Sequence, residues 1–137
     1  MTGSTAGLAD TSIFIASESG RPLRVELLPD RLAVSIITVG ELRAGVLAAR
    51  DLATRERRLA ALAAVMTLEP VPVDQDVAAA WAYLRVALRD AGRSMGVNDS
   101  WIAATAIALD VPLVTQDDDH AGLAGLAGLP GLRVIRV

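Results

Sequence analysis

The chain has 137 residues and a net charge of −3 at pH 7, a length that predicts one domain with its own core over residues 1–137. It contains no cysteine, one histidine (His120) and no lysine among its 13 basic residues, which excludes disulfides, thiolate chemistry, cysteine-ligated zinc, a histidine cluster and a lysine Schiff base. No apolar run approaches the roughly 20 residues that span a membrane, and the start, MTGSTAG, does not resemble a signal peptide. We therefore expect a cytoplasmic protein without a membrane partner.

The apolar content of the chain is high, at 53%, whereas aromatic residues make up only 3%, so the excess lies in alanine, leucine, valine and isoleucine. Small proteins rarely expose apolar surface on this scale, so we expect part of it to face another protein chain. The negative net charge supplies no basic field that would steer nucleic acid to the whole surface. A nucleic-acid partner would therefore be held locally.

Apolar periodicity and turn residues predict strands that alternate with helices along the chain. The expected strands cover residues 6–9, 31–37, 112–115 and 132–137, with an irregular or edge strand at 68–73, where Pro70 and Pro72 interrupt the pattern. The expected helices cover residues 13–17, 23–28, 39–49, 53–66, 76–91 and 100–109, and the Gly-Leu-Ala repeat at 121–131 is expected to form a short, loose helix ending in a Pro-Gly turn. The apolar face of the 53–66 helix is expected to contain Leu59, Leu62, Ala63 and Met66. Because each parallel strand pair needs a crossover, the pattern predicts a three-layer α/β/α sandwich with a mainly parallel central sheet.

Four carboxylates occupy equivalent places in this scheme, at the end of a strand or the start of a helix. Asp10 follows the first strand, Glu41 lies in the first turn after the second, Asp99 opens the 100–109 helix and Asp117 follows the 112–115 strand. In parallel sheets the ligand crevice lies beyond the carboxyl ends of the strands. We therefore expect the four carboxylates to meet at one end of the sheet.

Each of the four acids also has a purely structural interpretation. The candidate caps are Asp10 for the first helix, Asn98 or Asp99 for the 100–109 helix, and Thr38 with Glu41 as a Thr-x-x-Glu capping box. Asp117 is the first of three consecutive aspartates and fits a solvated turn. Four independent structural roles need not converge, so their convergence favours a shared site.

Converging carboxylates need a cation. Unit charges roughly 4 Å apart in a partly buried site repel by about 4 kcal/mol at an effective dielectric of about 20, so four such groups do not all stay ionised without one. Because the chain has no lysine, a metal ion is the natural neutraliser, and ligands that are all oxygen select a hard ion such as Mg²⁺ or Mn²⁺. A site of this kind supports metal-assisted hydrolysis of a phosphodiester.

Four segments carry a resemblance to a known family: ADTS at 9–12, ITVGELRAGV at 37–46, NDSWIAATAIAL at 98–109 and LVTQD at 113–117. In this order and spacing they resemble the acidic motifs of PIN-domain ribonucleases, and more narrowly of VapC-type toxins from toxin–antitoxin pairs. The resemblance implies that Asp10, Glu41, Asp99 and Asp117 are the catalytic residues and the metal ligands. It gives Thr11, Asn98 and Thr115 as supporting polar side chains.

The resemblance also implies a reaction and partners. It implies endonucleolytic cleavage of RNA that depends on Mg²⁺, with Mn²⁺ as a substitute, a homodimer, and silencing by a small DNA-binding antitoxin from the same operon. One position departs from the family pattern, because members often carry phenylalanine three residues after the last acid, where this chain has His120. The departure leaves open which of Asp117, Asp118 and Asp119 faces the metal, and Asp117 is preferred as the nearest to the strand end.

Three arginines, Arg85, Arg89 and Arg93, recur at every fourth position, which predicts one stripe on a helix. Either a solvated helix face or a track for an RNA backbone fits this stripe, so the three are candidate RNA contacts. His120 is interpreted as a turn or packing residue instead of a general base. Trp101 lies about 200° round the helix from Asp99 and is interpreted as a core or interface residue.

Other functions gather acids at strand ends, and two of them do not fit this chain. A receiver-type phosphoacceptor also needs a lysine, and a haloacid-dehalogenase-like phosphatase needs a second aspartate two residues after the first, where this chain has Ser12. The remaining alternative to an endoribonuclease is a catalytically silent PIN-like module that binds RNA or protein without cutting it.

Overall fold

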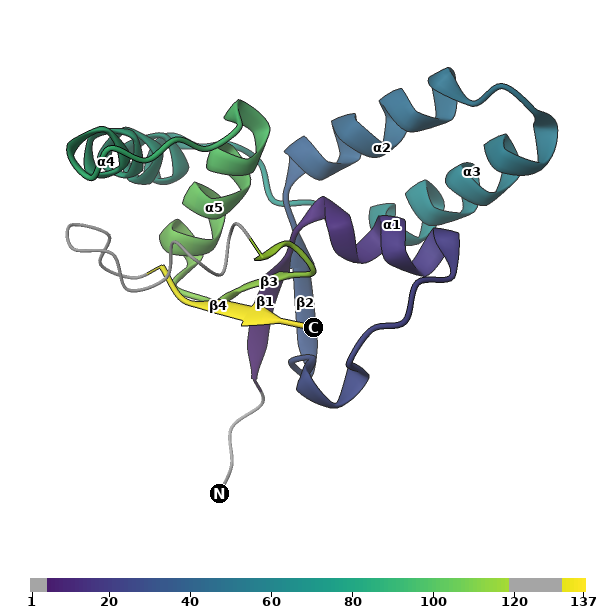
Figure 1. Cartoon of the computed structure of the whole chain (residues 1–137), viewed down its shortest axis with the longest axis horizontal. Helices are drawn as coiled ribbons and strands as arrows, with labels where there is room; N and C mark the ends of the chain where they lie inside the picture. Colours follow the sequence, from purple (N-terminus) through teal and green to yellow (C-terminus); the bar gives the residue numbers. More distant parts are fainter. Residues whose placement is uncertain (1–4, 119–131) are drawn as a thin grey trace.

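The structure is a computed structural model, and it describes residues 5–118 and 132–137 (Figure 1). Within them a strand, a helix and a second strand are followed by a run of four helices and then two strands. The elements are β1 (Ala6–Ala9), α1 (Thr11–Ser19), the 3-10 turn η1 (Val25–Leu27), β2 (Arg31–Val34), α2 (Ile36–Ala48), α3 (Leu52–Met66), α4 (Gln75–Asp90), α5 (Val97–Leu109), β3 (Leu113–Thr115) and β4 (Val134–Arg136). None of the helices among these residues combines the length and apolarity needed to cross a membrane.

The sheet is parallel throughout its described strands, in the order β2-β1-β3-β4. The register places Ala9 of β1 beside Val34 of β2 and Val114 of β3. The chain leaves β1 toward β2 on one side and returns to β3 on the other, so the strand order reverses between β1 and β3. Parallel sheets bind ligands at such a reversal, beyond the carboxyl ends of the strands. The strands pack tightly at Gly7, where a side chain would stand 2.8 Å from Val114 Cγ2.

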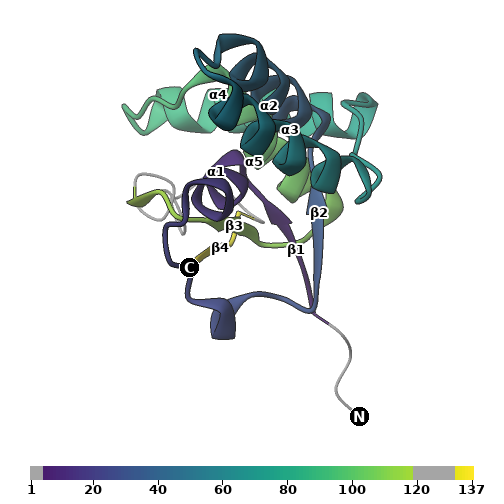
Figure 2. The same ribbon diagram turned by 90° about the vertical axis from the view of Figure 1, so that its right-hand side faces the viewer.

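Helices cover both faces of the sheet (Figures 1 and 2). Successive side chains of a strand point to opposite faces, so Leu8 belongs to one face and Ala9 to the other. The first face packs against α4 and α5 in a buried cluster of Leu8, Leu84, Ala87, Leu88, Ile102, Ala103, Ala106, Leu113 and Leu132. The second face packs against α1 in a smaller cluster of Ala9, Ile13, Val114 and Val137. The predicted three-layer α/β/α sandwich is confirmed.

Helices α2 and α3 run in opposite directions beside the end of β2 (Figure 1). Their shared core contains Val34, Val39, Leu42, Val46, Leu62 and Val65. The predicted apolar face of α3 is wrong except at Leu62, because Leu59 and Met66 are each 47% exposed and Ala63 is also exposed. The helix instead buries Leu62 with Val65, which is 0% exposed, along a narrower stripe.

The strand predicted at 31–37 ends at Val34, three residues early. Ser35 is the N-cap of α2, and its Oγ accepts a hydrogen bond from the backbone N–H of Ile37 (3.0 Å). The helix therefore begins at Ile36 instead of Val39, and both Thr38 and Glu41 lie inside it. The predicted capping box of Thr38 and Glu41 is wrong for this reason.

Two further elements are shorter than predicted. The helix expected at 23–28 is reduced to η1, and the strand expected at 68–73 is reduced to one parallel bridge between Ser35 and Val71. Pro70 and Pro72 cannot donate backbone hydrogen bonds, which limits pairing to the residue between them. The repeat predicted to be helical at 121–131 lies outside the described residues, as do Asp119 and His120.

Candidate active site

Asp10 is the central carboxylate of the candidate site, and the residue is only 2% exposed. Its backbone N–H donates to the carbonyl oxygen of Val114 (2.9 Å), which fixes it where the strand order reverses. Its Oδ1 accepts hydrogen bonds from the backbone N–H of Ser12 (3.0 Å) and from the Ser12 hydroxyl. Its Oδ2 accepts a hydrogen bond from the Thr115 hydroxyl (2.5 Å). The predicted capping role of Asp10 is confirmed, but a cap alone requires neither this burial nor the bond from β3.

The segment after β3 is tied to the segment after β1. The backbone N–H of Gln116 donates to Ser12 Oγ (3.0 Å), and that of Asp117 donates to Thr115 Oγ1 (2.9 Å). Thr115 therefore links Asp10 to the backbone of Asp117, across 105 residues of sequence. Asp118 instead forms an ion pair with Arg136 of β4. This pairing supports the choice of Asp117 as the acid of this segment.

Glu41 is connected to the same region through two threonines. Thr11 Oγ1 donates to Glu41 Oε1 (2.7 Å) and lies 3.0 Å from Thr38 Oγ1. A hydroxyl has one proton to donate, so Thr38 is the donor in the second contact. Because α2 begins at Ile36, Glu41 lies in the second helical turn instead of the first. Thr11 directly follows Asp10 in the chain, so its hydrogen bond brings the Glu41 carboxylate to the segment that carries Asp10.

Asp99 lies in the first turn of α5, whose N-cap is Gly96. Neither Asn98 nor Asp99 is the N-cap, so that structural interpretation is wrong. A side chain on Gly96 would stand 3.3 Å from Asp99 Oδ2, which shows that the carboxylate lies back over the start of the helix. Helix α5 starts near the beginning of α2, at the carboxyl edge of the sheet, and runs back toward the start of β3 (Figure 1).

The donor set fits a hard divalent cation. Every candidate ligand is a carboxylate, and Asp10 is buried, with its orientation fixed by two hydroxyls and a backbone N–H. As the described residues are placed, no group of three acidic, histidine or cysteine side chains could hold one ion together. Mg²⁺ usually keeps several waters and takes only one or two carboxylates with phosphate oxygens from a substrate.

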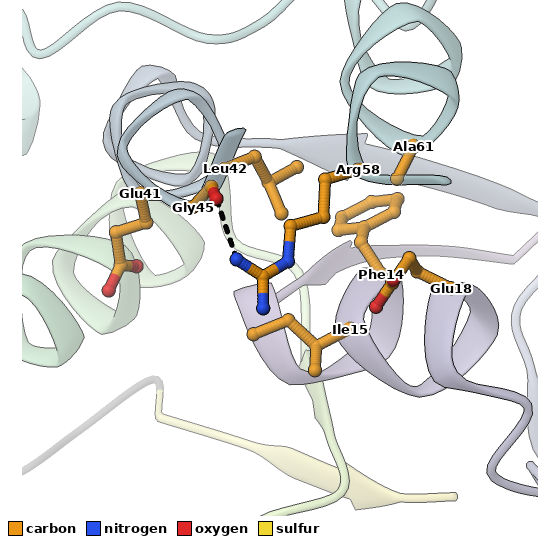
Figure 3. Close-up of a pocket in the computed structure, with 8 residues that line it drawn as sticks. All are labelled: Phe14, Ile15, Glu18, Glu41, Leu42, Gly45, Arg58 and Ala61. Atoms are coloured by element: carbon orange, nitrogen blue, oxygen red, sulfur yellow. Dashed lines mark hydrogen bonds between the residues drawn. The ribbon is translucent and has the colours of Figure 1, made fainter. Parts of the chain in front are cut away.

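A cavity of about 190 Å³ opens beside Glu41, between α1, α2 and α3 (Figure 3). It is lined by Phe14, Ile15, Glu18, Glu41, Leu42, Gly45, Arg58 and Ala61. Arg58 reaches across it from α3 and donates to the carbonyl oxygen of Gly45 (2.7 Å). Glu18 is held on the far side by an ion pair with Arg57 (3.2 Å). The walls are mainly apolar, and the charged side chains of Glu18, Glu41 and Arg58 complete the lining.

The predicted stripe of three arginines is only partly correct. Arg85 and Arg89 lie on exposed positions of α4, but the helix ends at Asp90 and Gly92 turns the chain with a φ of 66°. Arg93 therefore does not continue the stripe. The Arg85 guanidinium lies 5.3 Å from the centroid of the Trp81 ring, and Arg89 pairs with Asp90 (3.4 Å).

Four polar residues of the site region were not predicted: Ser12, Thr38, Trp81 and Ser100. Ser12 bonds to Asp10 and to the backbone of Gln116, and Thr38 bonds to Thr11. Trp81 donates its ring N–H to Ser100, which follows Asp99 in the chain. The sequence contains one local signal for Ser12, since Asp-x-Ser is the spacing of an aspartate that caps a helix. The other three contacts join residues that are distant in sequence and leave no local pattern.

Residues 8–126 match the family model of the PIN domain. The chain belongs to the PIN-domain family. This PIN domain is 51% identical over 122 residues to Ribonuclease VapC5 of Mycobacterium tuberculosis, covering 89% of this chain and 90% of the relative. It is 44% identical over 121 residues to Ribonuclease VapC4 of the same species, covering 85% of this chain and 89% of the relative.

Solved structures agree with the family assignment. The PIN domain superposes with a TM-score of 0.87 and 47% identity on a chain from VapBC-5 of Mycobacterium tuberculosis, a member of the VapBC family of toxin–antitoxin systems, covering 97% of this chain and 99% of that chain. It superposes with a TM-score of 0.75 and 26% identity on a chain of DNA-bound VapBC from Salmonella typhimurium, covering 96% of this chain and 98% of that chain. The resemblance to VapC-type proteins inferred from the four motifs is confirmed.

Proposed function

We propose that this PIN domain is an Mg²⁺-dependent endoribonuclease, with Mn²⁺ as a substitute, that acts in the cytoplasm as the growth-inhibiting toxin of a type II toxin–antitoxin module. The observation that carries this proposal is the buried Asp10 carboxylate, held by one hydroxyl from the first turn of α1 and one from the end of β3, where the parallel sheet reverses its order. Glu41, Asp99 and Asp117 stand on three other segments that border the same edge. The relatives named as ribonucleases support the same activity.

The proposed roles follow from the hydrogen bonds around each acid. Asp10, Glu41, Asp99 and Asp117 would hold the cation, which when bound supplies an electrophile for the scissile phosphodiester. Ser12 and Thr115 keep the Asp10 carboxylate in one orientation, and Thr11 does the same for Glu41.

The RNA backbone would approach the start of α5. The N-terminus of a helix carries partial positive charge and free backbone N–H groups, which attract phosphate. Arg85 and Arg89 on α4 are exposed and remain our candidate contacts to more distant phosphates, and Arg93 lies on the loop that leads from α4 to α5. These arginines would supply local positive charge to a protein whose net charge is negative.

Replacing Asp99 by asparagine tests the proposed activity. Asp99→Asn keeps size and removes a ligand charge, so we expect RNA cleavage to fall by more than about 100-fold, since groups that only orient a metal ligand are worth about 10–100-fold. Stability should change little, because Asp99 is not the N-cap and its dipole contribution is roughly 0.3–1 kcal/mol. The measurement is cleavage of RNA by the purified protein in Mg²⁺ or Mn²⁺.

Asp110→Asn is the matched control for Asp99→Asn. Asp110 ends the same helix, in a left-handed conformation that asparagine also tolerates, and its carboxylate pairs with Arg133 (3.2 Å) on the surface. This variant should cleave RNA like the wild type. Full activity in Asp99→Asn, with the control active as well, would contradict the nuclease assignment and favour a silent binding module.

We also propose that the cavity beside Glu41 receives an apolar side chain of a cognate DNA-binding antitoxin. Its walls are apolar, and an occupant would lie against one of the site carboxylates. Ala61→Met should fill part of the cavity and weaken antitoxin binding by at least about tenfold while RNA cleavage is retained, since a well-packed anchor contributes more than 1 kcal/mol. Ala60→Met, on an exposed neighbouring position of α3, is the control in a titration of antitoxin against RNA cleavage. Unchanged inhibition in Ala61→Met would place the antitoxin elsewhere.

The free protein is proposed to be a homodimer. Large apolar side chains remain exposed on α2 and α3, with Leu47 and Leu52 each 78% exposed at the turn between the two helices. A second copy of the chain is the partner that is always present at the concentration needed to cover them. Light scattering at micromolar concentration should give twice the chain mass of 14.3 kDa, and a monomer would contradict the proposal.

A further inference from the structure

The start of α5 is held differently from the start of the other described helices. Helices α1, α2, α3 and α4 each begin with a side chain that accepts a hydrogen bond from the first turn, supplied by Asp10, Ser35, Asp51 and Asp74. The N-cap of α5 is Gly96, which has no side chain that could accept such a bond. Yet α5 is the helix that carries Asp99 in its first turn, so its orientation decides where that carboxylate lies.

Ser100 ties the first turn of α5 from inside the helix, through the side of the turn that an N-cap does not serve. The residue is 0% exposed, and its hydroxyl donates to the carbonyl oxygen of Val97 (2.5 Å), the first residue of α5. Ser100 Oγ in turn accepts a hydrogen bond from the ring N–H of Trp81 on α4 (3.0 Å). Val97 and Ser100 lie on either side of Asp99 along the chain, so the two bonds hold the turn that bears the carboxylate.

The direction of the Trp81 N–H is itself fixed. The Trp81 ring is stacked on the Trp101 ring of α5, with centroids 4.4 Å apart and planes 5° from parallel. The Arg85 guanidinium lies 5.3 Å from the Trp81 centroid and adds a cation–π contact. A stacked indole cannot tilt freely, and its N–H stays aimed at Ser100 Oγ.

We infer that Trp81 and Ser100 are positioning residues that set the place of Asp99 in the site, an inference that rests on the proposed function. They do not contact the metal or the RNA. They act through the first turn of α5, so removing either one lets Asp99 move and weakens the cation site without changing its ligands. Groups that orient metal ligands typically alter affinity or activity by about 10–100-fold, and we expect about tenfold here.

The test uses the whole protein and MnCl₂ as the probe, with free Mn²⁺ measured by electron paramagnetic resonance. Trp81→Phe keeps an aromatic ring against Trp101 but removes the N–H donor together with the five-membered ring that carries it, whereas Ser100→Ala removes the shared hydroxyl. Each variant should raise the Kd for Mn²⁺ about tenfold and lower kcat, with an unchanged KM for RNA. The double variant should bind Mn²⁺ with the same Kd as Ser100→Ala, because both changes break the same hydrogen-bonded connection.

Thr105→Val is the matched control. Thr105 is also a buried hydroxyl of α5, 0% exposed, and it donates to the carbonyl oxygen of Trp101 (2.8 Å), away from Asp99. The melting temperature of this variant should fall as it does for Ser100→Ala. Its Kd for Mn²⁺ should equal that of the wild type. A merely structural role for Trp81 and Ser100 would give the same result as this control.

The outcomes separate the inference from the function on which it rests. If Asp99→Asn weakens Mn²⁺ binding while Trp81→Phe and Ser100→Ala bind like the wild type, the inference is overturned and the proposed function stands. Additive effects of the two substitutions would also overturn it, because they would act independently. If Asp99→Asn binds Mn²⁺ as tightly as the wild type, Asp99 is not a ligand, and the metal site and the inference both fail.

Discussion

The α4–α5 pair and the α2–α3 pair differ in how completely they bury their apolar side chains. Leu84 and Ile102, at 1% and 0% exposed, join α4 and α5 to the sheet, and the stacked rings of Trp81 and Trp101 complete the contact between the two helices. The α2–α3 pair encloses a small cluster around Val46 and Leu62 and leaves leucines exposed along its length. The first pair also leaves Tyr83 and Val86 exposed, at 63% and 47%, but the second exposes Leu47 and Leu52 at 78% each, and we propose that this turn faces a partner.

The two helix pairs carry different carboxylates of the proposed site. The α4–α5 pair carries Asp99 on a helix whose start is fixed by buried hydrogen bonds, so it supplies rigidity. The α2–α3 pair carries Glu41 beside an open cavity, so it supplies access for another molecule. Substitutions in the first pair should therefore act mainly on stability, and substitutions on the second mainly on association.

The largest effect is expected in the α4–α5 core. Ile102→Ala leaves a cavity at a position that is 0% exposed, and large-to-small changes of this kind cost about 2–5 kcal/mol of unfolding free energy. Leu59→Ala, at a position 47% exposed on α3 and outside the turn of Leu47 and Leu52, should stay within about 0.5 kcal/mol. Urea denaturation of both variants measures the contrast. Similar losses in the two variants would show that the α2–α3 pair is as fully buried in the free protein as the α4–α5 pair.

An intermediate effect is expected on association. A double substitution, Leu47→Asp with Leu52→Asp, places two charges on the exposed turn of α2 and α3 and should convert the proposed dimer to a monomer. The melting temperature of the monomer should be independent of protein concentration, unlike that of the wild type. Val25→Asp, at an apolar position that is 66% exposed on η1, is the control for added charge. If light scattering finds that the double variant is still a dimer, the dimer interface does not include this turn.

The smallest effect is expected at the N-cap of α3. Hydrogen bonds from the backbone N–H and the hydroxyl of Thr54 hold the pKa of Asp51 below its ordinary value, with smaller contributions from Arg57 and Arg58. A lowered pKa in the folded state means that the carboxylate stabilises the fold above its unfolded pKa and loses this contribution as the pH falls through the folded value, below about pH 4. Asp51→Asn keeps the cap but cannot ionise, so its melting temperature should fall less than that of the wild type between pH 5 and pH 3.

Asp51→Ala separates the cap from the charge. Alanine cannot cap, so this variant should melt lower than Asp51→Asn already at pH 7, and both should show the weaker dependence on pH. If the melting temperatures of the wild type and both variants fall equally on acidification, ionisation of Asp51 does not contribute to the pH dependence of stability. The effect is confined to the α2–α3 pair, since Asp51 is fully exposed at its turn.

Much of the fold was predictable because its strands and helices repeat local patterns. The prediction failed where one local pattern has two solutions. The β-branched run at 34–37 fits either a buried strand or a helix start, and the Ser35 hydroxyl decides for the helix. The stripe of arginines broke at Arg93 because Gly92 adopts a positive φ that ends the helical path.

The four acids could be proposed from sequence because strand ends and helix starts are local features. Their supporting bonds could not, since Thr115 reaches Asp10 across 105 residues and Trp81 reaches Ser100 across 19. The start of α5 shows the same limit. Asn98 and Asp99 have the chemistry of caps, but they lie inside the helix, whose N-cap is Gly96, and its first turn is tied by a buried serine and by a tryptophan from another helix.

The bond between Thr115 and Asp10 also has a consequence for synthesis of the chain. A ribosome that has completed the chain through α4 has released Asp10 and Glu41, but Asp99, the strand β3 and Thr115 have yet to follow. Parallel β1–β3 pairing is non-local, so it forms only after the intervening helices have been made. The proposed site is thus assembled last, and a nascent or prematurely terminated chain carries its first two acids without the arrangement that would make them dangerous to the RNA of the cell that produces it.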